Sequence, residues 1–419
     1  MIDVESLAKK AKIASRNLAL CVTDEKNWAL KLIAESVQAN RDAILTANEE
    51  DVAWAKKGGL SDALIDRLLL TPERLSANIK DLLRVIELPD PVGEVVEEGV
   101  LPNGLEFKKQ RVPLGVLAVI YEARPNVTLD VTSLALKSGN AVVLRGGSET
   151  IRTNTAIAGA IREGLKESAL PFEAVQMIAE TDRGLVLKLL QLDDWIDMVI
   201  PRGGAALHAF CKQNSRIPVI TGGIGICHLF VDDSANLKAS IEVIRNAKVQ
   251  RPSVCNALDT VLVHERIAGS FLTDLVERLK EDGVSFRADE KAYSILEGLG
   301  ADVRVAGPDD FDTEWLSLVL GLRVVKDIDE AIEHIYLHST GHSDGILSNN
   351  PQNIERFMHE VDSAVVYVNA STRFTDGAQL GLGAEVAVST QRYHARGPMA
   401  LRELTTYKWV VRGDYHIRK

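Results

Sequence analysis

The sequence predicts an α/β protein made of two doubly wound units and one small β-hairpin element. Strand-like and helix-like segments alternate from Gly115 onward. The strand-like segments are apolar on both faces, which is typical of parallel sheets covered by helices. With 419 residues, the chain is too long for one simple hydrophobic core, so at least two domains are expected.

The first ninety or so residues predict helices. Apolar residues recur at helical spacing through residues 24–45, and Thr71 followed by Pro72 is a typical helix start. Residues 93–112 then hold two β-prone stretches joined by Pro102-Asn103-Gly104, which predicts a hairpin. The β-prone tail 404–419 is a candidate partner for this hairpin, and one interpretation is an arm that pairs with another subunit.

Alternating strands and helices follow the hairpin. The first series has five predicted strands, at residues 115–123, 140–147, 174–180, 195–201 and 216–222. A second series begins after Cys255, with strands at 257–265 and 363–370. The predicted domain limits are therefore 1–92 with 113–250 for the first domain, 251–392 for the second, and 93–112 with 393–419 for the hairpin and tail.

Composition and charge narrow the function classes. The net charge is −11, which argues against phosphate neutralisation on a nucleic acid. No apolar run is long enough to span a membrane, and the N-terminal segment lacks the apolar core of a signal peptide. None of the four cysteines forms a C-x-x-C pair, which favours a reducing compartment. We expect a cytoplasmic protein that binds neither nucleic acid nor membrane.

Glycine pairs follow three predicted strands, at Gly146-Gly147, Gly203-Gly204 and Gly222-Gly223. The usual G-x-G-x-x-G fingerprint is missing after the first strand. Backbone amides at such strand ends can bind phosphate, and ligands of doubly wound sheets bind at the carboxyl ends of the strands. For any one pair a tight turn is the favoured explanation, but three pairs on one sheet shift the balance towards a nucleotide. The first domain is the expected dinucleotide-binding domain.

Cys255 is the candidate nucleophile, because it lies between an Arg-Pro-Ser turn and an apolar strand, where a side chain can face a cleft. The alternative is a buried free cysteine. We assign that structural role to Cys21, in a predicted helix, and to Cys211 and Cys227.

The histidines His334, His338 and His342 are spaced by four residues. The first two share a helix face that would suit a metal. No carboxylate partner is evident, so polar packing or substrate contact is favoured and no metal is expected. The chain has neither a G-x-S-x-G motif nor a P-loop lysine, which argues against a serine hydrolase and a P-loop kinase.

The stretch "GVLAVIYEARPNVTLDVTSLALKSGNAVVLRGGSE" resembles the cofactor-binding stretch of the aldehyde dehydrogenase superfamily. The motifs "QRPSVCNALDTVLVH", "AIEHIYLHSTGHSDGI", "VNASTRFTDG" and "GLGAEVAVSTQRYHARGPMALRELTTYKW" resemble one branch of that superfamily. This branch reduces L-glutamate 5-phosphate to L-glutamate 5-semialdehyde with NADPH and releases phosphate, as the second step of proline synthesis from glutamate. The resemblance implies an aldehyde-dehydrogenase-like fold, a catalytic second domain and an oligomerisation role for the hairpin and tail.

The resemblance also implies roles for individual residues. Cys255 falls on the catalytic cysteine and Asn126 on the asparagine of the oxyanion hole. The implied cofactor-binding residues are Arg145, Gly146, Gly147, Ser148, Glu149, Gly203, Gly204, Gly222, Gly223 and Glu314. Hydrolytic members carry a water-activating glutamate where this chain has Ile220-Thr221, and general-base catalysis contributes about 10²–10⁴-fold. We therefore expect slow hydrolysis and chemistry linked to phosphate.

Polar residues in loop-like stretches are the candidate substrate contacts. They are Arg124, Arg251, Ser253, Asn369, Ser371, Thr372, Arg373, His394 and Arg396, and each arginine has a structural salt bridge as its alternative. By resemblance, a homo-oligomer and an association with glutamate 5-kinase are expected. Two other functions stay open: an oxidative, hydrolytic aldehyde dehydrogenase, and a nucleotide-binding scaffold without turnover.

Overall fold

The computed structural model describes residues 3–418, and its contacts divide the chain into two compact units. The first unit comprises Met1–Thr221, Gly381–Ala387 and Met399–Lys419, and the second comprises Gly222–Leu380 and Val388–Pro398. The extreme ends of the two predicted terminal segments, residues 1–2 and 419, lie outside the described residues.

The first unit has a four-stranded sheet in the order β5-β4-β3-β6, in which every pairing is parallel. Its strands are β3 (Val116–Tyr121), β4 (Ala141–Arg145), β5 (Val175–Met177) and β6 (Met198–Arg202). Its helices are α1 (Val4–Leu18), α2 (Thr23–Ala39), α3 (Arg41–Lys57), α4 (Asp62–Leu68), α5 (Pro72–Glu87), α6 (Asn126–Lys137), α7 (Ile151–Lys166), α8 (Arg183–Leu189) and α9 (Ala205–Asn214), with 3-10 turns η1 (Ser148–Thr150) and η2 (Phe172–Ala174). Every residue of β3 and β4 is buried, as expected for a parallel sheet covered by helices.

Two local expectations for this unit are wrong. Residues 216–222 do not form a strand; they make two isolated bridges, one between Val219 and Val199 and one between Gly222 and Ser389. Pro218 has no amide hydrogen, so it cannot donate to a continuous ladder. Cys21 lies in the connection between α1 and α2 rather than inside a helix.

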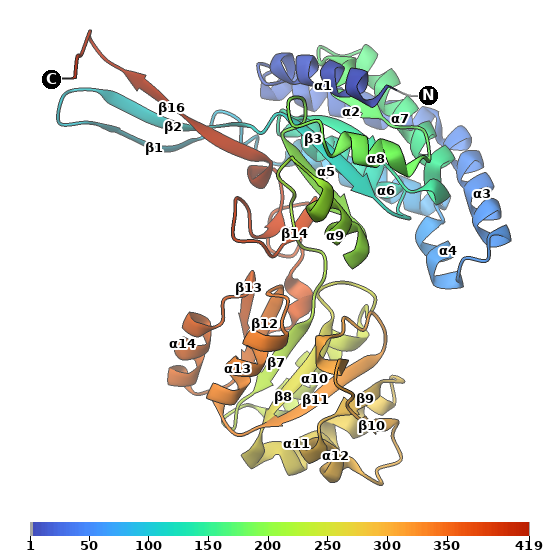
Figure 1. The fold of residues 1–419 in the computed structure, drawn as a ribbon, viewed down its shortest axis with the longest axis vertical. Helices are drawn as coiled ribbons and strands as arrows, with labels where there is room; N and C mark the ends of the chain where they lie inside the picture. Colours follow the sequence, from blue (N-terminus) through green and yellow to red (C-terminus); the bar gives the residue numbers. More distant parts are fainter. Residues whose placement is uncertain (1–2, 419) are drawn as a thin grey trace. The chain divides into compact units, whose positions relative to one another are not determined.

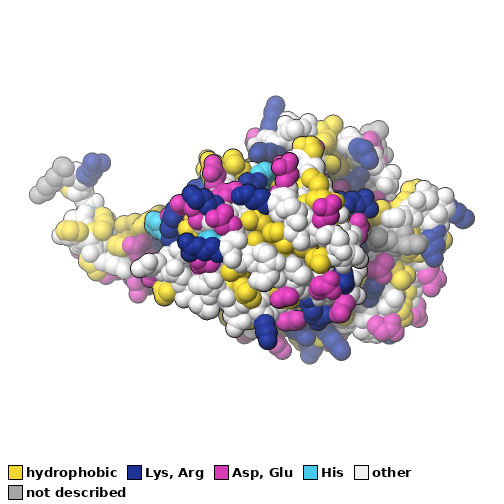
Figure 2. All heavy atoms as spheres, turned by 90° about the horizontal axis from the view of Figure 1, so that it is seen from below, with side chains coloured by type: hydrophobic (Ala, Val, Ile, Leu, Met, Phe, Trp, Pro, Cys, Tyr) yellow, Lys and Arg dark blue, Asp and Glu magenta, His cyan; other side chains and the backbone are white. Residues whose placement is uncertain are grey.

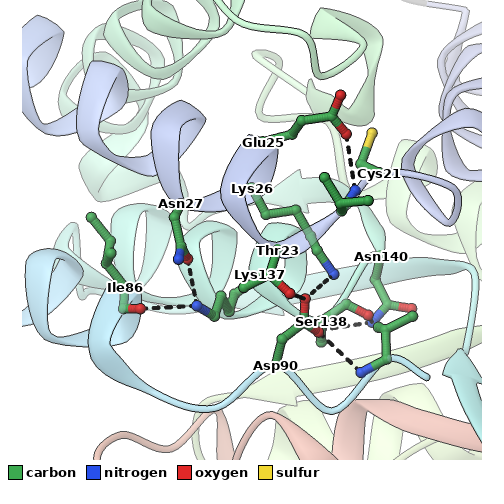
Figure 3. A network of polar contacts seen from close by, with 12 residues as sticks. Cys21, Thr23, Glu25, Lys26, Asn27, Ile86, Asp90, Lys137, Ser138 and Asn140 are labelled. Carbon is green, nitrogen blue, oxygen red and sulfur yellow. Dashed lines mark hydrogen bonds and ion pairs between the residues drawn. The ribbon is translucent and has the colours of Figure 1, made fainter. Parts of the chain in front are cut away.

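A buried polar network joins the helices of the first unit to the start of the arm (Figure 3). Lys26 forms an ion pair with Asp90, and the two side chains are 1% and 6% exposed. Lys137 donates to the Asn27 side chain and, at 2.9 Å, to the carbonyl of Ile86. A charge buried this deeply is tolerated only when it is paired and hydrogen-bonded, so the network fixes how α2, α5 and α6 pack.

The predicted hairpin and tail form a three-stranded antiparallel sheet, which we call the arm. It consists of β1 (Val95–Val100), β2 (Glu106–Pro113) and β16 (Thr405–Arg412). The predicted pairing of the tail with the hairpin is confirmed, from Thr405 opposite Pro113 to Arg412 opposite Glu106. Figure 1 shows these strands running side by side and extending from the rest of the first unit.

The second unit has a seven-stranded parallel sheet in the order β10-β9-β11-β8-β7-β12-β13. Its strands are β7 (Cys227–Val231), β8 (Leu258–His264), β9 (Ser285–Ala288), β10 (Val303–Val305), β11 (Val319–Val325), β12 (Ser343–Leu347) and β13 (Val365–Val368). Its helices are α10 (Leu237–Val249), α11 (Glu265–Lys280), α12 (Glu290–Leu296), α13 (Ile328–His338) and α14 (Pro351–Glu360), with 3-10 turns η3 (Asp310–Asp312) and η4 (Thr372–Phe374).

The second unit begins at Gly222, whereas the sequence placed the domain limit at residue 250. The reason is β7, which pairs with β8 on one side and β12 on the other and so belongs to the second sheet. The remaining elements are the short strands β14 (Ala387–Ser389) and β15 (Gly397–Met399), which pair with each other, and the 3-10 turn η5 (Arg402–Leu404).

Two further features concern the apolar character of the helices and the distribution of charge on the surface. Among residues 3–418, none of the helices combines the length and the apolar character that a membrane crossing needs. On the face shown in Figure 2, basic and acidic side chains are interspersed.

Candidate active site

Three loops meet at the carboxyl edge of the first sheet, after β3, β4 and β6. The side chain of Glu122, after β3, accepts a hydrogen bond from the amide of Gly204, after β6, at 3.0 Å. The amide of Ala123 donates to Glu149, after β4, at 2.9 Å. The structure therefore brings together the predicted cofactor residues at 145–149 and 203–204.

The glycines in these loops are required by close packing. A Cβ added at Gly147 would lie 2.3 Å from the Glu149 carboxylate, and one at Gly203 would lie 2.5 Å from that of Glu122. One at Gly146 would lie 2.0 Å from the side chain of Asn154. A larger residue at any of these three positions would displace the side chain that it meets. Two of those side chains, Glu149 and Glu122, make the hydrogen bonds that join the loops.

The side chain of Arg145 is hydrogen-bonded to main-chain carbonyls near the end of its own strand. Its guanidinium donates to the carbonyls of Gly146 at 2.7 Å and Thr181 at 3.1 Å, and the residue is 8% exposed. Burial lowers the pKa of Arg145. The side chain therefore stiffens the β4 loop and has less freedom to reach a ligand than the sequence suggested.

The helices that start at this edge leave main-chain donors without side-chain caps. Neither α6 nor α9 has a side-chain cap in its first turn. In α6 the amides of Val127 and Thr128 donate to the preceding main-chain carbonyls, so the start of α9 is the freer of the two. Free amide hydrogens at a helix N-terminus, with the helix dipole behind them, suit a phosphate group. The carboxyl edge of this sheet therefore fits the pyrophosphate of a dinucleotide.

Asn126 is the first residue of α6, and its side-chain amide donates to Asp130 at 2.8 Å. Burial raises the pKa of Asp130 to about 6. The amide has two hydrogens, so one is oriented by Asp130 and the second stays available to a ligand. Arg124 is exposed in the loop just before α6.

Cys255 lies in the second unit between α10 and β8, the junction that its sequence context predicts. It is a half-buried free thiol, while Cys211 and Cys227 are fully buried as expected. Because β8 starts at Leu258, the cysteine lies at the amino ends of β7 and β8. Ser253 is half-buried in the same loop.

The backbone of Cys255 rests on the segment Ile224–Ile226. A Cβ added at Gly225 would lie 1.6 Å from the carbonyl oxygen of Cys255, so only glycine fits there. The Gly225 amide donates to Glu314 at 2.9 Å. Burial raises the pKa of Glu314. Gly222 and Gly223 precede this segment; Gly223 has a φ of +80°, and Gly222 bridges to Ser389.

The turn η4 supports the cysteine loop from the other side. Thr372 donates through its hydroxyl to the carbonyl of Asn256 at 2.7 Å, and the Asn256 amide donates to the carbonyl of Thr375 at 2.9 Å. Ser371 is buried and caps the turn through the amide of Arg373.

Arg373 lies within electrostatic reach of both Arg251 and the Cys255 thiol. Burial and the neighbouring charge of Arg251 lower the pKa of Arg373, while Cys255 acts in the opposite direction. Arg373 is half-buried and donates to Gln250 at 3.1 Å, whereas Arg251 is exposed. This pair of cations favours an anionic ligand.

Other predicted substrate contacts have different partners. Asn369 follows β13 at the carboxyl edge of the sheet. Its side-chain oxygen accepts from the main-chain amide of Ser348, and its side-chain NH₂ donates to the Ser348 carbonyl, each at 2.9 Å. Arg396 is paired with Asp362 at 2.6 Å, the structural alternative for this residue. His394 is exposed and has a φ of +59°.

The histidines of α13 pack against other rings. The ring centroids of His334 and His338 are 4.3 Å apart, and His334 also packs edge-on against Phe311 and His228. His342 lies beyond the end of the helix and is buried, with Nδ1 2.8 Å from Ser343. Across residues 3–418, no three His, Cys, Asp or Glu side chains are arranged to hold a metal ion.

The chain matches known proteins over its whole length. Residues 2–292 match the model of the aldehyde dehydrogenase family. An acetylating aldehyde dehydrogenase from Geobacillus thermoglucosidasius shares the fold at 18% identity, with a TM-score of 0.69 over 99% of this chain and 97% of that one. The chain belongs to the aldehyde dehydrogenase family.

Within that family, the relatives are more specific. The chain is 56% identical to a γ-glutamyl phosphate reductase from Photobacterium profundum, over 100% of both chains. The crystal structure of γ-glutamyl phosphate reductase from Thermotoga maritima has a TM-score of 0.97 and 50% identity, again over 100% of both chains. The resemblance to γ-glutamyl phosphate reductase that the motifs indicated, and the predicted fold class, are confirmed.

Sequence reasoning missed three residues that shape these sites, Glu122, Asn256 and Thr340, and it noted Gly225 only as the end of the glycine-rich stretch that starts at Gly222. Gly225 and Asn256 were within reach, because they stand beside motifs already singled out. Thr340 contacts residues 114 and 116 positions away, and no local pattern reports such a contact.

Proposed function

We propose that this protein reduces L-glutamate 5-phosphate to L-glutamate 5-semialdehyde with NADPH, through a thioester on Cys255, in the synthesis of proline. One observation carries the proposal. Cys255 is half-buried before the start of β8, its backbone contacts Gly225 and the η4 turn bonds its neighbour Asn256, and Arg373 is within electrostatic reach of its thiol. The names of the full-length relatives supply the substrate.

The first step makes the thioester. The Cys255 thiolate attacks the carbonyl carbon of the acyl phosphate, the C–S bond forms, and the C–O bond to phosphate breaks. Phosphate leaves with its electron pair and takes up a proton from solvent. The charges of Arg373 and Arg251 favour the phosphate dianion.

The second step reduces the thioester. The thioester carbon would accept a hydride, which a nicotinamide cofactor would supply when bound. The C–S bond then breaks, the aldehyde is released and the thiolate is restored. The Asn126 amide and the Cys255 amide are the proposed donors to the oxyanion of each step, and one such donor is typically worth about 3–4 kcal/mol.

The cofactor residues are proposed from the carboxyl edge of the first unit. Gly146 and Gly147 offer main-chain amides, α9 starts without a side-chain cap, and Ser148 and Glu149 offer groups for a ribose. Glu314 is the proposed ligand of the nicotinamide ribose. The preference for NADPH over NADH belongs to the resemblance.

Water should not complete the reaction. Ile220, which stands where hydrolytic members have a glutamate, is 2% exposed and apolar. Without a general base, hydrolysis of the thioester is slower by about 10²–10⁴-fold. This distinguishes the proposed reductase from an oxidative, hydrolytic enzyme.

An assay in the reverse direction tests the proposal. Glutamate semialdehyde, NADP⁺ and protein are mixed with and without inorganic phosphate, and reduced cofactor is followed by absorbance. Steady turnover only with phosphate supports the reductase. Equal turnover without phosphate contradicts it and supports an oxidative, hydrolytic enzyme. No turnover in either case would support a scaffold.

The arm is the proposed oligomerisation element. Both of its faces carry exposed apolar side chains, including Val96, Val100, Trp409 and Val411. A single three-stranded sheet without a covered face is rarely stable alone, so we propose that a second copy covers it in a cytoplasmic homo-oligomer. An association with glutamate 5-kinase is a further proposal, and co-purification of the two proteins tests it.

A further inference from the structure

We propose that Thr340, acting through Gly225, positions the Cys255 nucleophile. The inference rests on the proposed function only for the role of Cys255. Thr340 lies in the loop between α13 and β12, and no role in binding or chemistry has been assigned to it above.

The Thr340 hydroxyl bonds two main-chain groups on either side of Gly225. It accepts from the amide of Ile226 at 3.0 Å and donates to the carbonyl of Ile224 at 2.9 Å. The hydroxyl thus uses one hydrogen and one lone pair on neighbours of the same glycine. A side chain without a hydroxyl makes neither bond.

A third bond completes the support of this segment. Glu314 accepts from the Gly225 amide at 2.9 Å, so three groups of Ile224–Ile226 are bound by side chains from elsewhere in the second unit. Gly225 is held against the carbonyl of Cys255, where even a methyl group would lie at 1.6 Å. A shift of Gly225 therefore becomes a shift of the nucleophile.

The loop that carries Thr340 is itself anchored. The neighbouring Ser339 donates through its hydroxyl to Asp344 at 2.6 Å, and the other carboxylate oxygen of Asp344 accepts from the amide of His228 at 2.9 Å. Both Asp344 and His228 are fully buried in adjacent strands. Thr340 thus connects a rigid part of the sheet to the segment beneath the cysteine.

The effect on catalysis follows from geometry. A misplacement of about 1 Å in a reacting group can cost about 10²-fold in rate, while binding groups elsewhere keep their positions. We expect loss of Thr340 to lower kcat and to leave KM for the semialdehyde and NADP⁺ within about threefold.

The experiment compares Thr340→Val, Thr340→Ala and Thr340→Ser. Valine keeps the shape of the threonine side chain without its hydroxyl. Alanine also lacks the hydroxyl and avoids crowding if the valine variant does not fold. Serine keeps the hydroxyl. The matched control is Thr273→Val, because Thr273 also donates to a main-chain carbonyl, at 3.0 Å, on the exposed side of α11. Steady-state kinetics, melting temperature and iodoacetamide labelling of Cys255 are measured for each.

The expected result is a kcat lower by about 10- to 100-fold in Val and Ala, unchanged melting temperature, and Ser and Thr273→Val within about threefold of the parent. The rate of Cys255 labelling changes in Val and Ala but not in Ser. Equal kcat and equal labelling in Ala and Ser would overturn the inference, as would a loss that only follows melting temperature. The labelling rate reports the position of the Cys255 thiol without any substrate. It therefore tests the role of Thr340 even if Cys255→Ser keeps full activity and the proposed function is wrong.

Discussion

The thiol of Cys227 donates a hydrogen bond to the carbonyl oxygen of Cys255 at 3.3 Å. The two cysteines differ in environment: Cys227 is fully buried in β7, and Cys255 is half-buried in the loop before β8. Burial raises the pKa of Cys227 well above its usual range. Cys227 is therefore a neutral structural donor beneath the candidate nucleophile.

Selective alkylation follows from this difference. Under native conditions at pH 8, we predict that iodoacetamide modifies Cys255 first, because reactivity follows thiolate content and exposure. Cys211 and Cys227 should react only after unfolding, since burial raises the pKa of Cys211 to about 11 and raises that of Cys227 well above its usual range. Peptide mass spectrometry over time measures the order, and native labelling of Cys227 as fast as Cys255 would contradict it.

A methyl group at Gly225 should disrupt the candidate site. We predict that Gly225→Ala lowers kcat by at least about 10²-fold, because the added atom cannot coexist with the Cys255 carbonyl at 1.6 Å. Gly269→Ala is the control in the same unit, since nothing lies within 4 Å of its added Cβ in α11, and it should stabilise the helix by about 1 kcal/mol. Similar kinetics in the two variants would refute the packing argument.

The ion pair of Lys26 and Asp90 should be essential for the first unit. Asp90→Asn leaves the Lys26 charge buried without its partner, and we predict a loss of about 3–5 kcal/mol in the free energy of unfolding. Adding Lys26→Met should recover part of this loss. The control is Asp81→Asn in the exposed Arg84–Asp81 pair, expected to cost less than about 1 kcal/mol. Urea unfolding compares the variants, and equal effects would argue against a buried pair.

Buried histidines predict a loss of stability in mild acid. Burial lowers the pKa of His334 from 6.5 to about 2 and that of His342 to about 4. The unfolded chain takes up these protons below about pH 6.5 and the folded chain does not. Their stabilisation is therefore complete above pH 6.5 and is lost as pH falls, by up to about 1.4 kcal/mol per pH unit for each histidine.

The variant His334→Phe tests this dependence, because it keeps an aromatic ring and removes one titrating group. Between pH 6 and pH 5, the free energy of unfolding should fall less steeply in the variant, by about 1.4 kcal/mol per pH unit. Exposed His359→Gln should leave the slope unchanged. Identical slopes in His334→Phe and the parent would show that His334 takes up its proton in the folded state.

Local pattern predicted much of the fold. The apolar runs at 116–121, 141–145 and 258–264 are buried strands, and Pro102-Asn103-Gly104 joins the two strands of the hairpin. The position of Cys255 between a helix and a strand was also evident, because Pro252 and the apolar run after it leave a local signal.

Long-range contacts were not predictable in the same way. The domain limit was placed too late because the strand at Cys227 looks the same whichever sheet it joins. Arg145 and Arg396 looked like ligand contacts, yet their partners are the carbonyl of Thr181 and the carboxylate of Asp362, which no motif announces. The support of Cys255 by Gly225 and Thr340 depends on side-chain packing that only coordinates reveal.

Trapping the thioester tests the central claim most directly. Protein, glutamate semialdehyde and NADP⁺ are mixed without phosphate, and the Cys255 peptide is weighed by mass spectrometry. We predict one equivalent of reduced cofactor, a glutamyl group on Cys255 that persists in water, its release on adding phosphate, and no adduct in Cys255→Ser. Continued cofactor reduction without phosphate, or an adduct on any other residue, would contradict the account.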